Sequence, residues 1–162
     1  MKKYILLIAI IFASCAEQKQ EPKTAGYSIR GEEESYMIGS DETTDFIRKW
    51  ADAHNERDME SILSMEKADI KIELPDGTVI NGQDEHSKVL ESFFANNVTW
   101  KPYWMLPYNS VVAKETWVIA GFALTSNVDG EENVVLHMGD IQLEDGLVSR
   151  IIVYENQRPK KQ

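Results

Sequence analysis

The chain has 162 residues, and 43% of them are hydrophobic, which is enough for one domain with an apolar core and leaves little for a second. Its 27 acidic residues outnumber its 17 basic residues and give a net charge of −10. This charge repels nucleic-acid phosphates and anionic lipid headgroups, so it argues against a nucleic-acid partner and against electrostatic attachment to a membrane.

The N-terminal segment has the pattern of an export signal. Two lysines precede an uncharged apolar run, residues 4–12, which is too short to span a bilayer as a stable helix. Small residues then lead to Cys15, the only cysteine of the chain. This arrangement resembles the lipobox of bacterial lipoproteins, although Phe12 stands where that motif prefers leucine. It predicts a lipoprotein signal peptide over residues 1–14 and lipidation of Cys15, with an ordinary cleaved signal peptide as the alternative.

Lipidation of Cys15 implies a bacterial cell-envelope protein, anchored in the membrane and facing the periplasm or the cell surface. Each buried methylene of an acyl chain contributes about 0.8 kcal/mol, and lasting attachment requires more than one chain. Loss of two lysines with the signal peptide leaves a net charge of −12, so the protein part would not adhere to the membrane by itself. A secreted domain without further cysteines forms no disulfides, and packing alone must stabilise it.

Residues 16–40 are rich in Glu, Gln, Lys and Gly and show no sustained hydrophobic periodicity. With the cysteine they predict a lipidated and flexible tether over residues 15–40. The apolar clusters YSI and YMI within this segment offer an alternative, in which one of them packs onto the domain as an edge strand.

Three helices are expected at the start of the domain, which is predicted over residues 41–157 and followed by a basic tail, residues 158–162. The first helix, residues 43–58, carries an apolar stripe formed by Phe46, Ile47, Trp50, Ala53 and His54. A second short helix, residues 59–65, can be capped by Asp58. A third helix opens after Gly82 and buries Val89, Leu90, Phe93 and Phe94.

Six strands are expected around and after the third helix. Alternation of Ile70, Ile72 and Leu74 with polar residues predicts a strand that turns at a Pro-Asp-Gly sequence into a second strand. The rest of the chain predicts strands over residues 98–108, 115–127, 132–143 and 147–155. Prolines at positions 102 and 107 require the first of these to be bent, bulged or at an edge. The element order indicates an α+β domain in which a curved antiparallel sheet wraps over the helices.

The helical segment FIRKWADAHNERDMESILSM, the turn segment ELPDGTVING and the terminal segment EDGLVSRIIVYE stand in an order that resembles the nuclear transport factor 2-like (SnoaL-like) superfamily. The resemblance covers about residues 43–155. It implies a cone-shaped fold in which a curved antiparallel sheet and three N-terminal helices enclose an apolar pocket, while the outer sheet face often forms dimers. The superfamily includes isomerases, dehydratases, cyclases, transport factors and domains without a known reaction, so the fold alone does not give the function.

Comparison with the ketosteroid-isomerase branch argues against its chemistry. The resemblance places Trp50 at the oxyanion tyrosine, Leu74 at the general-base aspartate and Gly139 at the protonated aspartate of that branch. None of these side chains can perform those roles. Glu73 and Asp140 stand one position away, and a one-residue slip turns a strand side chain to the opposite face. We therefore expect a protein that is not an enzyme of this kind.

Histidines are the remaining candidates for polar chemistry in the pocket. His137 is in phase with the expected concave face, and His54 lies on the apolar stripe of the first helix; each suits proton transfer near neutral pH, and each is equally explained as a hydrogen-bonded core residue. His86 is expected on an exposed first helical turn. The histidine spacings match no compact ligand motif, so neither a metal nor another cofactor is predicted.

An aromatic concentration marks the C-terminal half of the domain. In strand phase Trp100 and Trp104 point to one face and Tyr103 to the other, provided that no bulge at the prolines shifts the phase. One face should line the core or the pocket, and the other offers a surface for a homodimer; ordinary core packing is the alternative. The residues predicted to line the pocket are Trp50, His54, Trp100, Trp104, Trp117 and His137.

The function expected from these features is binding of a small hydrophobic or amphipathic molecule, without its transformation, by a lipid-anchored envelope protein. One alternative is an enzyme of the isomerase or dehydratase type that uses His54 or His137 as acid or base. Another is a protein-interaction module that uses the outer aromatic face.

Overall fold

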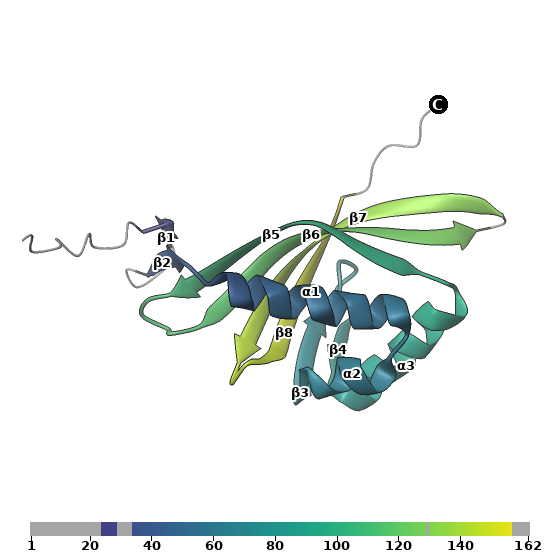
Figure 1. Ribbon diagram of the computed structural model, residues 1–162, viewed down its shortest axis with the longest axis horizontal. Helices are drawn as coiled ribbons and strands as arrows, with labels where there is room; N and C mark the ends of the chain where they lie inside the picture. The colour runs from purple at the N-terminus through teal and green to yellow at the C-terminus, as the bar shows by residue number, and fades with distance from the viewer. Residues whose placement is uncertain (1–23, 29–33, 129, 157–162) are drawn as a thin grey trace, which may run out of the picture.

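The computed structural model describes residues 24–28, 34–128 and 130–156. A long, curved and open sheet carries three helices on its concave side (Figure 1). The elements are β1 (Gly26–Tyr27), β2 (Ser35–Ile38), α1 (Asp41–Glu56), α2 (Met59–Ser64), β3 (Glu66–Glu73), β4 (Val79–Asn81), α3 (Gln83–Ala95), β5 (Thr99–Ser110), β6 (Thr116–Val128), β7 (Glu131–Glu144) and β8 (Leu147–Asn156).

The sheet has the strand order β1-β2-β5-β6-β7-β8-β3-β4. Every neighbouring pair is antiparallel except β3 and β8, which run parallel. The predicted α+β class, with a curved and mainly antiparallel sheet over three helices, is therefore confirmed. Strands β3 and β4 pair at the end of the sheet that is farthest from β1 and β2. The β3–β4 hairpin and α3 together therefore close that end of the concave face.

Local sequence signals mark both ends of α1 and the start of α2. Two acidic residues in the first turn of α1 favour a helix N-terminus, and Arg57 ends the helix in a left-handed conformation with φ of 60°. The carboxylate of Asp58 then accepts a hydrogen bond from the backbone N–H of Ser61 at 3.0 Å and caps α2. This tight connection folds α2 back beside α1.

The core lies between α1 and the inner face of the sheet. Alternate residues of β6 point inward and are buried, as expected for a strand with one face on a core. They pack against the buried stripe of α1 and against inward residues of β3, β7 and β8. The central members of this core are Ile47, Trp50, Ala51, Ile62, Ile70, Val118, Ala120, Phe122, Ile141, Val148 and Ile151.

A bulge in β5 reverses the face on which its later side chains lie. Trp100 pairs with the inward-facing Leu124, but the register shifts between Pro102 and Trp104, so that Trp104 pairs with Gly121. Trp104 therefore lies on the outer face, and the expectation that it shares a face with Trp100 is wrong. A bulge adds one residue to one strand, so every side chain that follows it in that strand points to the opposite face of the sheet.

Part of the segment expected to be a tether belongs to the sheet. β2 pairs with β5, and the carboxylate of Glu34 accepts hydrogen bonds from the backbone N–H groups of Val112 and Ala113 at 2.8 and 3.0 Å. The alternative left open, in which YMI packs onto the domain as a strand, is what the structure shows for residues 35–38, although β1 pairs with the other side of β2 and takes the edge position. The predicted signal peptide, Cys15 and the basic tail lie outside the described residues, and within those residues no helix is long and apolar enough to cross a membrane.

Candidate functional site

An apolar cavity of about 360 Å³ lies between α3 and the concave face of the sheet. Its wall is mainly aliphatic and aromatic, with contributions from Leu74, Leu90, Phe93 and Val153 among others. Four polar side chains also reach it: Asp76, His86, His137 and Glu155. The cavity is thus an apolar chamber with a few polar groups at fixed points, which is the usual composition of a small-molecule site.

The structure brings three of the six predicted pocket residues to this cavity, namely Trp50, Trp100 and His137. His54 lies just behind the wall, where its ring stacks on that of Trp100 with centroids 4.7 Å apart and an interplanar angle of 9°. His137 is on β7, beside the C-terminal end of β8, and its Nε2 is 3.3 Å from a carboxylate oxygen of Glu155.

The other two predicted pocket residues lie elsewhere. Trp104 is 41% exposed on the outer face because of the β5 bulge. Trp117 is buried, but it stacks on Tyr108, and its indole N–H donates to the carboxylate of Glu115 at 3.0 Å. Trp117 directly precedes Val118 on β6, so its side chain lies on the opposite face of the sheet from Val118, which faces the concave side. Neither residue lines the cavity.

His86 corrects an expectation from the sequence, because it is buried rather than exposed. Only 4% of it is accessible, and its Nδ1 lies 3.0 Å from Oε2 of Glu66. The side-chain amide of Gln83 explains this position, since it donates to the backbone carbonyls of Leu63 and Glu66 at 2.6 and 3.0 Å. These bonds hold the first turn of α3 against the beginning of β3 and turn its histidine inward.

Glu66 was not identified as a candidate from the sequence. Its side chain is fully buried, and its Oε1 accepts a hydrogen bond from the indole N–H of Trp50 at 2.8 Å. Strand alternation offers no signal for it, because the register of β3 against β8 shifts between Glu66 and Lys71, and Ala68, which has the same parity as Glu66 and Ile70, is exposed.

His54 is held in one tautomer. Its Nδ1 lies 2.7 Å from the backbone carbonyl oxygen of Trp50, so Nδ1 carries the proton and donates it, and Nε2 keeps its lone pair. Burial lowers the pKa of His54 to about 4, against the opposing effect of this hydrogen bond and with a smaller contribution from His86, so the ring is neutral at pH 7. Nε2 is buried and has no hydrogen-bond partner among the described residues.

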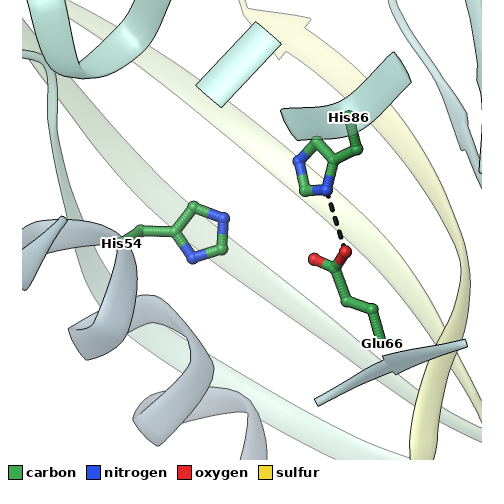
Figure 2. A group of neighbouring side chains, drawn as sticks. All are labelled: His54, Glu66 and His86. Atoms are coloured by element: carbon green, nitrogen blue, oxygen red, sulfur yellow. Dashed lines mark hydrogen bonds and ion pairs between the residues drawn. The ribbon is translucent and has the colours of Figure 1, made fainter. Parts of the chain in front are cut away.

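His54, Glu66 and His86 converge from α1, the start of β3 and the first turn of α3 (Figure 2). One ring nitrogen from each histidine and one carboxylate oxygen lie within 4.8 Å of one another, and all three residues are buried. Figure 2 shows the free nitrogen of His54 directed toward the Glu66 and His86 pair. We call this group the His54–Glu66–His86 cluster.

The residues considered for ketosteroid-isomerase chemistry are not arranged for it. Leu74 lines the cavity, whereas Asp140 lies on the outer face, where its Oδ1 accepts a hydrogen bond from the Tyr108 hydroxyl at 2.9 Å. Glu73 pairs with Arg150. What the cavity does hold is an imidazole, His86, oriented by a buried carboxylate, which is an arrangement that can accept or donate a proton or bind a cation.

Comparison with known proteins supports the fold. No family model and no curated protein matches the chain. Among solved structures, a candidate ketosteroid isomerase from Kribbella flavida is 18% identical, with a TM-score of 0.61 over 77% of this chain and 85% of its own. The epoxide hydrolase/cyclase-like enzyme SalBIII, which has a role in pyran-ring formation in the polyether salinomycin, is 16% identical, with a TM-score of 0.62 over 71% and 91%.

A third similar structure is a nuclear transport factor 2-like protein of unknown function from Cytophaga hutchinsonii. It is 15% identical, with a TM-score of 0.55 over 70% of this chain and 89% of its own. At these identities the likeness establishes the architecture: the chain has the nuclear transport factor 2-like fold.

Proposed function

We propose that this nuclear transport factor 2-like domain binds a small hydrophobic or amphipathic molecule in its cavity, and that Cys15 anchors it by lipidation in a bacterial cell envelope. The observation that supports binding is the cavity itself. Its volume of about 360 Å³ lies in the range of small-molecule sites, and its wall is mostly apolar.

The distribution of polar groups indicates the shape of such a molecule. His86 reaches the cavity from α3, whereas His137 and Glu155 reach it from β7 and β8. An apolar body with a polar substituent would bury its body against the aliphatic wall and satisfy one of these groups. The similar proteins named for work on steroids and polyether rings support this ligand class by analogy.

Tryptophan fluorescence tests this proposal, because Trp50 and Trp100 line the cavity. Titration of the protein with anilinonaphthalene sulfonate, a steroid and a fatty acid is expected to give a saturable response with at least one of them. Trp100→Phe should reduce the response by about half or more, whereas the matched variant Trp104→Phe, on the outer face, should preserve it. Absence of a saturable response to all three probes would refute the proposal.

Membrane attachment through Cys15 is tested separately. Mass spectrometry of the mature protein should find a chain that begins at a lipidated Cys15. Cys15→Ser should move the protein from the membrane fraction to the aqueous fraction, and Ser14→Ala, which keeps a small residue at the neighbouring position, should leave it membrane-bound. A free thiol on the mature wild-type chain would contradict the anchor.

A second candidate function is proton-transfer catalysis of the isomerase or dehydratase type. The bond between His86 Nδ1 and Glu66 favours His86 over His54 and His137 as the acid or base, because a carboxylate that fixes one ring nitrogen leaves the other to act on a ligand. Conversion of a β,γ-unsaturated ketone, followed by absorbance of the conjugated product, should then require His86 and tolerate His137→Gln. No turnover by the wild type would reject this candidate.

A further inference from the structure

The His54–Glu66–His86 cluster has a set of donor atoms suited to a metal ion. Two imidazoles and one carboxylate are the protein ligands typical of zinc and related divalent transition metals, which commonly keep a further coordination position for another molecule. Here the three donors come from three separate elements and lie within 4.8 Å of one another. We propose that this cluster binds one divalent transition-metal ion of the Zn²⁺ class.

The free nitrogen of His54 is the observation that points to a ligand. Its Nε2 has no hydrogen-bond partner within the part of the chain that the structure describes and is shielded from solvent, in a residue that is only 6% exposed. Its tautomer is already the one that metal binding needs, since Nδ1 donates to the Trp50 carbonyl and Nε2 presents a lone pair. A buried acceptor without a partner is unfavourable, and a cation at this position would satisfy it.

The charge of Glu66 leads to the same conclusion. The carboxylate is fully buried, and within the described residues its bonded partners are Trp50 and His86, neither of which is a permanent cation. A buried carboxylate requires compensation, and a divalent ion supplies it. The nearest alternative, a protonated His86, would neutralise Glu66 and still leave His54 Nε2 without a donor.

Groups behind the donors are arranged to keep them in place. Trp50 contacts two of the three, because its indole N–H donates to Glu66 Oε1 and its backbone carbonyl accepts from His54. Gln83 fixes the backbone at Glu66 from the same turn of α3 that carries His86. Hydrogen bonds of this kind orient metal ligands in known sites and set their basicity.

Coordination would also connect the cluster to the cavity. Metal–nitrogen and metal–oxygen bonds of about 2.0 to 2.2 Å require the donors to move closer together than 4.8 Å, which small rotations of the histidine rings can achieve. Because His86 lines the cavity, a remaining coordination position would face it. The metal would then favour a ligand whose polar end is an anion or a carbonyl oxygen.

Titration of the purified full-length protein with Zn²⁺ and Co²⁺ tests the inference without any organic ligand or turnover, so its outcome is independent of both proposed functions. Calorimetry should find about one ion per chain, and Co²⁺ should develop the visible absorption of a site with nitrogen and oxygen ligands. His54→Gln, Glu66→Gln and His86→Gln should each weaken binding by about tenfold or more. His137→Gln, which removes a cavity histidine outside the cluster, should bind as the wild type does.

Nuclear magnetic resonance of the wild-type imidazoles keeps the test valid if a variant fails to fold. Addition of Zn²⁺ should shift the ring nitrogens of His54 and His86 and leave those of His137 unchanged. The inference is overturned if no ion binds, if a bridging water alone satisfies His54, or if all three histidines respond equally to surface-bound metal.

Discussion

At the scale of single residues, Trp50 has two roles that a core tryptophan does not usually combine. Its ring fills the centre of the core and lines the cavity, while its two polar groups hold Glu66 and His54. An indole N–H that donates to a buried carboxylate is a charge-assisted bond, and its loss leaves the carboxylate partly unsatisfied. The position of the cluster therefore depends on this one side chain.

Trp50→Phe should lower the free energy of unfolding by about 1 to 3 kcal/mol, because it removes the donor to Glu66 and part of the ring volume. Urea denaturation of both proteins would measure the difference. Trp104→Phe makes the same chemical change at an exposed site and should alter stability by about 0.5 kcal/mol or less. Equal effects of the two substitutions would show that the bond to Glu66 contributes little.

At the scale of elements, the β5 bulge depends on a glycine in the adjacent strand. A Cβ added at Gly121 would lie 2.7 Å from the Tyr103 ring and also against Trp104, both of which cross it on the outer face. No such contact is tolerated without movement, since neighbouring strands have fixed spacing. The absence of a side chain at Gly121 thus allows the two aromatic rings to lie over β6.

Gly121→Ala is accordingly expected to destabilise the protein by about 1 to 3 kcal/mol, the usual cost of overpacking. Thermal and urea unfolding would measure it. Gly26→Ala is the matched control, because no atom of the described residues lies within 4 Å of a Cβ at that position. If Gly121→Ala were as stable as Gly26→Ala, the aromatic rings would have to be free to move away from β6.

On the outer face, the hydrogen bond between Tyr108 of β5 and Asp140 of β7 lies at a site that makes the stability of the fold depend on pH. Burial raises the pKa of Asp140 above its ordinary value of 3.8, although the Tyr108 hydroxyl and the Arg150 charge oppose this shift. The folded protein therefore holds this proton more tightly than the unfolded chain does, and the ionised carboxylate destabilises the fold at neutral pH. This destabilisation disappears as the pH falls through the raised pKa toward 3.8.

Asp140→Asn should therefore gain stability relative to the wild type at pH 7, and this difference should shrink as the pH is lowered toward 3.8. Urea titrations over that range would measure it. Asp76→Asn provides a contrast of opposite sign, because the backbone N–H of Thr78 lowers the pKa of Asp76 and its carboxylate is favourable at neutral pH. A constant difference between Asp140→Asn and the wild type would contradict the raised pKa.

The helices and strands were predictable because their signals are local. The stripe of α1 and the alternation of β3 and β6 depend only on the period of the backbone conformation. The face of Trp104 was not predictable from that period, since one extra residue in β5 reverses the phase. His86 and Glu66 were missed for a related reason: their burial depends on how α3 docks on β3, through Gln83, and not on either segment alone.

At the scale of the whole molecule, the convex side of the sheet carries an apolar surface. Trp104 pairs with Gly121, Gly121 with Met138, and Met138 with Tyr154, so these residues form one row across four strands. Directly paired residues share a face. Trp104, Met138 and Tyr154 are all exposed, as is the nearby Leu106. An exposed apolar row on the side opposite the cavity is a surface suited to a partner.

We expect this surface to pair with a second copy of the chain, as the superfamily resemblance implies, because a two-fold contact between identical convex faces would bury the row on both chains at once. Sedimentation equilibrium of the full-length protein in detergent should then show a dimer. Met138→Glu places a charge in the middle of the row and should give a monomer with an unchanged fold, since the side chain is exposed. Val112→Glu, a similar change at an exposed valine in the turn between β5 and β6 and away from this row, should remain dimeric. A wild type that is monomeric at all concentrations would instead favour a different protein as the partner of this face.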